Sequence, residues 1–184
     1  TESIAAAVER FQARGGIIIG DENLAPAIKP DILLQTHARP KEADAARRLN
    51  QEKAAALRKE LDAHYARYRE SSNPDVITRC RTFGSTDYVF TINDLREYGK
   101  YVGHHGLVME NGLPSDAAIS VRRGGGHVYD LVNHQEVSAE AAEGRLAWNV
   151  HLGPCEGRVF MVTDNAIAFV DIACPKEVRR GESA

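Results

Sequence analysis

Residues 127–163 read HVYDLVNHQEVSAEAAEGRLAWNVHLGPCEGRVFMVT, and this stretch decides the fold. Leu146, Trp148 and Val150 alternate with Ala147 and Asn149, which is the period of a strand with one buried face. A continuous apolar run at 159–162 predicts a more deeply covered strand. Polar and Gly-Pro turns separate these strands, so the stretch predicts an antiparallel β meander with the tryptophan in the core. No catalytic constellation can be read in it.

Further strands are predicted on both sides of this stretch. Val76–Phe83 and Tyr88–Ile92 alternate around a turn cluster at 84–87, and shorter strands are expected at 107–109, 117–121 and 167–172. The triple glycine at 124–126 predicts a turn, and 93–106 is expected to be irregular. Seven or eight short strands with turn signals between them are typical of an immunoglobulin-like antiparallel β sandwich.

The amino-terminal part has a helical pattern. Apolar residues at helical spacing predict a helix over 3–13 that ends at Gly15-Gly16, followed by a short apolar strand at 17–19. This order resembles the closing αβ unit of a parallel α/β domain. Prolines interrupt residues 21–40, which we expect to form an extended connector. From Pro40, an apolar stripe that ends with Tyr65 and Tyr68 predicts a long amphipathic helix as far as Ser71.

The predicted fold class is therefore α+β. We expect four segments: an αβ remnant with its connector at 1–39, a long helix at 40–73, a β sandwich at 74–175 and a linker towards a following domain at 176–184. Both ends look cut, so the chain is expected to be a fragment of a longer polypeptide.

Composition excludes several classes of protein. The net charge is −3 with both signs spread along the chain, which predicts no nucleic-acid partner. No apolar run approaches the roughly 18 residues that suggest a membrane span. Cys80, Cys155 and Cys174 form no CxxC pair, so a structural zinc site is not expected. Sequence leaves open whether two of them form a disulfide or all three are buried small side chains.

Several short runs carry a resemblance to a known class of domain. VYDL at 128–131, QEV at 135–137, LAWNV at 146–150 and GRVF at 157–160 resemble the C-terminal β-sandwich accessory domain behind the catalytic barrel of many glycoside hydrolases. The run GGIIIGDENLAPAI at 15–28 is similar to the last elements of the α/β domain between barrel and sandwich in β-galactosidase-like enzymes. The resemblance covers about 40 residues well, and no stretch matches the catalytic motifs of those barrels.

This resemblance implies a non-catalytic structural module of a larger carbohydrate-active protein. Its partners would be neighbouring domains of the same polypeptide, and a secreted or periplasmic location would follow. The alternative is a carbohydrate-binding module that uses aromatic side chains on a loop. A small independent enzyme is a further alternative, and it would need polar groups that converge in a pocket.

One loop is the best candidate for a ligand-binding surface. Tyr98, Tyr101 and His104 lie in the segment 97–105, and binding residues are often held on loops by a rigid scaffold. His104 and His105 are adjacent and so point to opposite sides of an extended segment, which argues against a shared metal ion. We assign no catalytic, cofactor-binding or metal-binding residue.

Other polar residues have simpler interpretations. Asp87, Asp94, Asp116 and Asp130 would act as acid–base pairs only if the fold brought them together. For Asp130, a bond to a nearby arginine or backbone N–H is the expected role. Arg122-Arg123-Gly124-Gly125-Gly126 lacks the ending of a phosphate loop and predicts a turn with two edge arginines.

Overall fold

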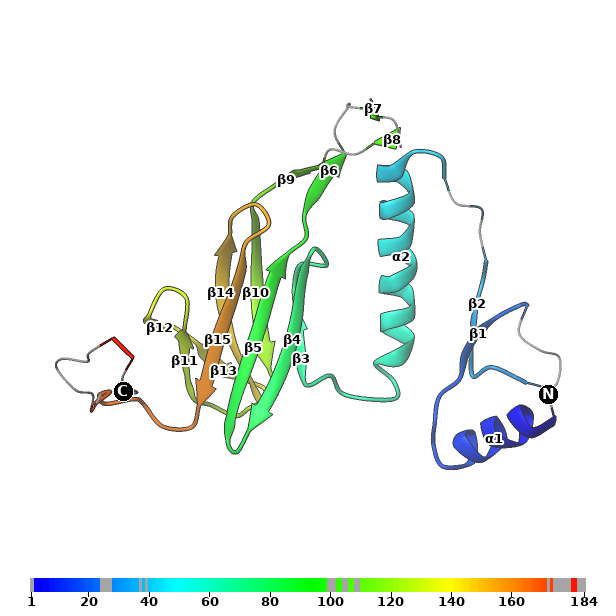
Figure 1. The fold of residues 1–184 in the computed structure, drawn as a ribbon. Coiled ribbons are helices and arrows are strands. Elements are labelled where there is room, and N and C mark those ends of the chain that lie inside the picture. Colours follow the sequence, from blue (N-terminus) through cyan, green and yellow to red (C-terminus); the bar gives the residue numbers. More distant parts are fainter. Residues whose placement is uncertain are drawn as a thin grey trace. The chain divides into compact units, whose positions relative to one another are not determined.

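The chain divides into two compact units in the computed structural model, Thr1–Ala66 and Arg67–Ala184. Both helices of the described residues lie in the first unit, and most of the described strands lie in the second (Figure 1). Within the described residues, no helix is long and apolar enough to cross a membrane. The structure describes residues 2–23, 28–36, 38, 40–98, 102–103, 106–107, 110–171, 173 and 180–181.

A small parallel pair of strands follows α1 (Glu2–Ala13) in the first unit. β1 (Ile19–Asp21) pairs in parallel with β2 (Ile32–Leu34). The strand predicted at 17–19 therefore lies at 19–21, and the connector predicted at 21–40 contains a strand that the sequence pattern did not indicate. Asp31 fixes this pair, because its Oδ2 accepts hydrogen bonds of 2.9 Å from the Ile18 N–H and from the Gln12 side-chain amide. The bond from Ile18, followed by that from Gln12, holds the pKa of the Asp31 carboxyl below its usual value.

The second helix, α2 (Ala43–Leu61), is shorter than the predicted one. Its prediction as far as Ser71 is wrong, because Arg69–Ser71 form the strand β3 and Tyr68 packs against the core of the second unit. Tyr65 and Tyr68 keep helical spacing beyond the end of the helix. The periodicity therefore continues after the backbone has left the helical conformation.

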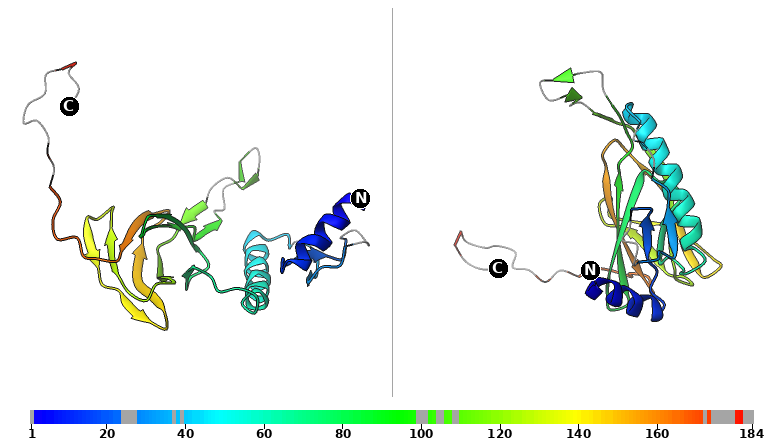
Figure 2. Two further views of the ribbon diagram at one scale, coloured as in Figure 1. Left: turned by 90° about the horizontal axis from the view of Figure 1, so that it is seen from below. Right: turned by 90° about the vertical axis from the view of Figure 1, so that its right-hand side faces the viewer.

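Two antiparallel sheets make up most of the second unit, and Figure 2 shows them as two layers. The four-stranded sheet has the order β13–β14–β10–β3, formed by Glu140–Ala142, Arg145–Leu152, Ser115–Val121 and Arg69–Ser71. The five-stranded sheet has the order β12–β11–β15–β5–β4, formed by Gln135–Val137, His127–Asp130, Gly157–Thr163, Thr86–Asn93 and Val76–Phe83. The chain is thus an α+β protein with a β sandwich.

The core lies between the two sheets, where both contribute every second residue. Trp148 of β14 meets Phe160 of β15 with ring centroids 5.4 Å apart and ring planes inclined by 58°. The prediction that Trp148 belongs to the core is confirmed, since only 2% of it is exposed. The remaining buried members of this cluster are Val76, Val89, Ala117, Ile119, Val121, Val128, Leu146, Val150, Leu152 and Val162.

The meander predicted for 127–163 is wrong in its pairing. β14 pairs with β10 and β13 in the four-stranded sheet, whereas β11 and β15 pair with each other in the five-stranded sheet. The chain therefore changes sheet twice within this stretch, once before β13 and once at the Gly-Pro corner at 153–154. Alternation predicts that a segment is a strand, but it does not say which sheet the strand joins.

Two further strand predictions need correction. The sequence predicts an irregular segment at 93–106, but this segment contains β6 (Arg96–Tyr98) and β7 (Val102–Gly103). β6 pairs with β9 (Glu110–Gly112), and β7 pairs with β8 (Gly106–Leu107). A strand expected at 167–172 does not form in its described residues, 167–171. Phe169 and Val170 are instead 81% and 75% exposed.

Candidate functional site

The structure describes only part of the predicted ligand-binding loop. Tyr98 is the last residue of β6, where its backbone pairs with Glu110 of β9. Tyr101 and His104 lie outside the described residues. At the base of this hairpin, Arg96 Nη1 contacts Glu110 Oε2 at 2.7 Å. The tyrosine pair therefore remains a prediction from sequence.

The point where this hairpin leaves the sandwich is fixed by the buried side chain of Asn93. Its Nδ2 donates hydrogen bonds of 2.7 Å to the carbonyl oxygens of Leu113 and Gly153. Its Oδ1 accepts bonds from the Leu95 N–H at 3.0 Å and from the Ser115 hydroxyl at 2.8 Å. The amide thus joins three chain segments. Sequence reasoning missed this residue, although its inward position at the end of β5 was a usable signal.

A shallow pocket of about 490 Å³ lies on the outer face of the four-stranded sheet. Asp116 of β10 and His151 of β14 face each other in register, and Asp116 Oδ1 lies 2.8 Å from His151 Nδ1. Both side chains are largely exposed, at 84% and 67%. The pocket is lined by Ser72, Asp116, Ala117, Ala118, Asn149, Val150 and His151. Sequence reasoning named Asp116 but did not find its histidine partner, because the pairing of the strands was not known.

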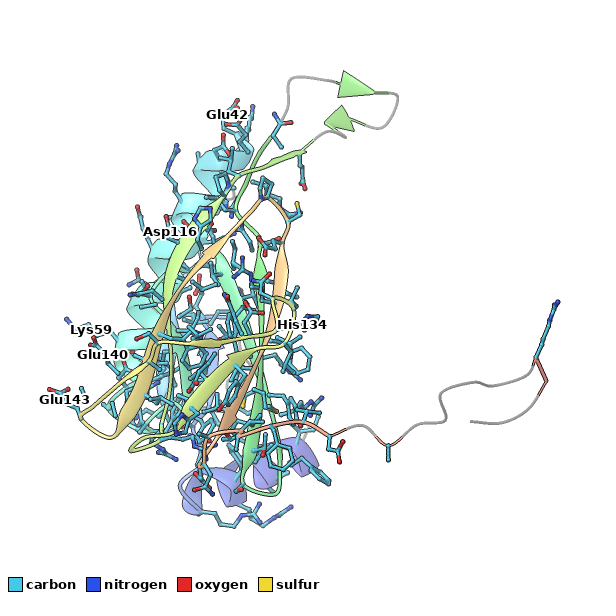
Figure 3. The ribbon with its side chains drawn as sticks, turned by 90° about the vertical axis from the view of Figure 1, so that its left-hand side faces the viewer. Glu42, Lys59, Asp116, His134, Glu140 and Glu143 are labelled. Atoms are coloured by element: carbon cyan, nitrogen blue, oxygen red, sulfur yellow. The ribbon has the colours of Figure 1, made fainter. Side chains whose placement is uncertain are left out.

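Two other histidines, His127 and His134, do not line this pocket. His134 lies in the turn between β11 and β12, on the opposite side of the sandwich from Asp116 (Figure 3). His127 of β11 contacts Glu136 of β12 instead, with Nδ1 2.7 Å from Oε1. Within the described residues, no group of three or more His, Cys, Asp or Glu side chains could hold a metal ion.

Asp87 is a buried carboxylate of the sandwich that accepts three hydrogen bonds from side chains. It is 1% exposed, and it accepts hydrogen bonds from the Tyr68 hydroxyl at 2.5 Å, the Thr82 hydroxyl at 2.6 Å and Arg123 Nη1 at 3.1 Å. Burial by itself would raise the pKa of Asp87, but these donors outweigh it and hold the pKa below its usual value. Arg123 also contacts Asp164. Arg123 is therefore a half-buried ion-pair residue and not the edge arginine that was expected.

Asp130 shows the same arrangement at the end of β11. Its carboxylate accepts hydrogen bonds from the N–H groups of Val132 and Asn133, from the Asn133 amide at 2.8 Å and from Arg158 Nη1 at 3.2 Å. Burial opposes ionisation, yet these bonds hold the pKa of Asp130 below its usual value. The predicted bond to a nearby arginine or backbone N–H is confirmed.

These two carboxylates are therefore held ionised. A general acid that works near neutral pH needs a raised pKa, and both shifts have the opposite sign. Arg123 and Arg158 neutralise the charges of the two carboxylates, and neutral donors satisfy their remaining hydrogen-bond acceptors. The geometry therefore supports a structural role for both carboxylates.

Cys80 lies beside Asp87. Burial, and then the charge of Asp87, raise the pKa of the Cys80 thiol, which disfavours the thiolate. Cys80 and Cys155 are free, and Cys174 lies outside the described residues.

Comparisons with known proteins give partial structural matches at low identity. No family model matches the chain, and no curated protein gives a significant match. One solved structure is α-L-fucosidase isoenzyme 2 from Paenibacillus thiaminolyticus, with a TM-score of 0.47 and 14% identity over 67% of this chain and 19% of that one. A second is a rhamnosidase from Novosphingobium sp. PP1Y, with a TM-score of 0.46 and 14% identity over 96% of this chain and 17% of that one.

A third match is a catalytic mutant of a GH42 β-galactosidase from G. stearothermophilus, with a TM-score of 0.32 and 19% identity over 71% of this chain and 14% of that one. The chain thus spans less than a fifth of the length of these solved structures. All three TM-scores lie below 0.5.

Proposed function

We propose that this chain is a non-catalytic structural module of a larger carbohydrate-active protein. Its role would be to hold neighbouring domains of the same polypeptide in a fixed orientation by means of a rigid, immunoglobulin-like sandwich. The observation that carries the proposal is the state of the two buried carboxylates. Asp87 and Asp130 are each bound to an arginine and have lowered pKa values, so they tie strands together and are unsuited to proton donation.

The polar ties of the sandwich support the same role. Asn93 and Asp87 each connect segments far apart in sequence, and Arg145 donates to the Arg67 carbonyl oxygen at 2.9 Å and to the Ser120 hydroxyl. Such networks rigidify a fold when every member is satisfied. A rigid domain of this kind would fix the orientation of one neighbouring domain relative to the next. The assignment to a carbohydrate-active parent rests on the sequence resemblance, as does a location outside the cytoplasm.

A hydrolysis assay tests the absence of catalysis. The purified 184-residue chain would be incubated at high concentration with a panel of chromogenic β-galactosides, α-L-fucosides and α-L-rhamnosides. We expect no turnover above the blank while the fluorescence of the buried Trp148 shows a native fold. Turnover that Asp116→Asn or His151→Ala abolishes would reject the proposal and identify the shallow pocket as a catalytic site.

A carbohydrate-binding module is the second candidate, and the pocket at Asp116 and His151 is the observation that favours it. Its carboxylate, imidazole and carboxamide groups are suited to sugar hydroxyls, and the loop with Tyr98 and Tyr101 would offer aromatic faces. Titration of the ¹⁵N-labelled chain with mono- and oligosaccharides at millimolar concentration separates the candidates. Shifts confined to Asn149 and His151, or to the loop, would support binding at that place.

A further inference from the structure

The outer face of the five-stranded sheet carries several exposed apolar side chains next to Arg79 and Arg81 of β4. Ile77 of β4 is 52% exposed, and Phe90 and Ile92 of β5 are 39% and 52% exposed. Val159 and Met161 of β15 are half-buried on the same face. Contiguous apolar surface on a folded domain marks a place where something binds. This surface is therefore a candidate interface.

One row of side chains crosses this face in register. Tyr129 of β11 lies opposite Met161 of β15, Met161 lies opposite Tyr88 of β5, and Tyr88 lies opposite Arg81 of β4. Neighbouring strands are about 4.8 Å apart, so the row from Tyr129 to Arg81 is roughly 14 Å long. The row begins with a phenol, continues over apolar groups and ends with a cation. In the part of the chain that the structure describes, Arg81 has no ion-pair partner.

The chain itself supplies a segment that begins at the first residue of this row. After β15 the backbone returns to Tyr129, whose hydroxyl oxygen accepts a hydrogen bond of 2.8 Å from the Ile167 N–H. The following residues, Ala168 to Asp171, make no strand, and Phe169 is 81% exposed. A tethered apolar segment therefore lies beside an uncovered apolar face. Both belong to the same compact unit.

We propose that the segment 167–171 closes over the outer face of the five-stranded sheet along this row. An extended chain rises about 3.3 Å per residue, so Ile167 to Asp171 spans roughly 13 Å, close to the length of the row. Side chains two residues apart point to the same side of an extended segment. Ile167, Phe169 and Asp171 therefore face the sheet together. Phe169 covers Met161 and Tyr88, and Asp171 pairs with Arg81.

The tether favours this occupant over a second copy of the chain. The Ile167–Tyr129 hydrogen bond holds the segment at one end of the row. A short linker gives an effective concentration in the millimolar range, far above that of a second molecule in a dilute solution. The carboxylate at the far end also matches the charge of Arg81. Glu136, the acidic residue next to Tyr129 on this face, is already in contact with His127.

Disulfide cross-linking of the full chain tests the proposal. Arg81→Cys and Asp171→Cys would be combined in a chain whose native cysteines are replaced by alanine, and the protein would be oxidised at micromolar concentration. The matched control joins Asp171→Cys to Asn149→Cys, which is exposed on the other sheet. A disulfide needs Cα atoms within about 7 Å of each other, so we expect at least about tenfold more intramolecular product from the Arg81 pair.

The products distinguish the outcomes. Covalent dimers in place of intramolecular product would overturn the proposal and make the face an interface between two copies. Equal yields from both pairs, or no product from either while Trp148 fluorescence stays native, would also overturn it.

Amide hydrogen exchange gives a second measurement that needs no cysteine. We expect Arg81→Glu and Asp171→Arg each to speed exchange of the Phe169 and Val170 amides by about tenfold or more, and the double variant to restore slow exchange. Single variants with unchanged exchange would contradict the pairing of Asp171 with Arg81.

Discussion

The Tyr68 hydroxyl donates a hydrogen bond of 2.5 Å to Asp87 Oδ2 and so links the two sheets of the sandwich. Tyr68 directly precedes β3 of the four-stranded sheet, and its carbonyl oxygen accepts from the Arg122 N–H at 2.7 Å. Asp87 belongs to β5 of the five-stranded sheet and also binds Arg123. The segments before β3 and after β10 thus both meet the same buried carboxylate.

We expect Asp87→Asn to destabilise the sandwich strongly. The substitution removes the buried charge that faces Arg123, which keeps its contact with the more exposed Asp164. Breaking a buried ion pair by removing one partner costs about 3 kcal/mol. Urea unfolding followed by Trp148 fluorescence measures the loss. Asp116→Asn is the matched control, since that carboxylate is 84% exposed and a surface change of this kind stays within about 0.5 kcal/mol. Equal stability of the two variants would contradict the structural role of Asp87.

Acid should weaken the same network. The folded-state pKa values of Asp87 and Asp130 lie below their usual values, so their contribution to stability is complete above the unfolded pKa of about 3.9. It is lost as the pH falls through the folded-state values. Urea midpoints measured from pH 7 down to pH 2 should decrease below about pH 4. The decrease should be smaller in Asp87→Asn, which has already lost one of the two groups.

We expect alkaline pH to destabilise the sandwich by deprotonating the Tyr68 hydroxyl. Burial, and then the bond to Asp87, raise the pKa of Tyr68 to about 12. Because the folded-state value lies above the unfolded value of about 10, this contribution is complete below pH 10 and is lost between about pH 10 and 12. The ultraviolet absorbance of phenolate should show one tyrosine that titrates late. That late step should be missing in Tyr68→Phe, and its persistence there would assign it to another tyrosine.

Asn93→Asp should be destabilising although it is almost isosteric. The Nδ2 atom donates to the carbonyl oxygens of Leu113 and Gly153, and an oxygen in its place would face both acceptors without a hydrogen to donate. We expect a loss of about 2–3 kcal/mol, the cost of unsatisfied buried polar groups. Asn149→Asp on the exposed face is the control and should leave the unfolding midpoint nearly unchanged. A neutral effect at Asn93 would show that the amide orientation is not required.

Gly126 is the one member of the triple glycine that we expect to reject a side chain. Its φ is +139°, and a Cβ there would lie 2.6 Å from the Thr163 carbonyl oxygen. Gly126→Ala should therefore cost about 1–3 kcal/mol through backbone strain and the clash. Gly124→Ala is the matched control, because nothing lies within 4 Å of its Cβ position. Thermal unfolding of both variants provides the comparison, and similar midpoints would contradict it.

Local patterns were sufficient to predict the longer strands of the sandwich. A two-residue alternation of apolar and polar residues predicts the limits of β4. The same alternation predicts the buried positions Leu146, Trp148 and Val150. The same rule failed for 167–171, where alternation is present but no strand forms. Helical spacing at Tyr65 and Tyr68 failed in the same way, since it continues past the end of α2.

Sequence alone thus determined that this protein is an α+β chain with a β sandwich, because secondary structure and burial depend on neighbours within a few residues. Only the tertiary structure decided that β14 and β15 lie in different sheets. It also decided that Arg123 meets Asp87 across 36 positions and that Asp116 meets His151 across 35. The physical reason is that pairing depends on which distant strand best fills the core, and no local period encodes that choice.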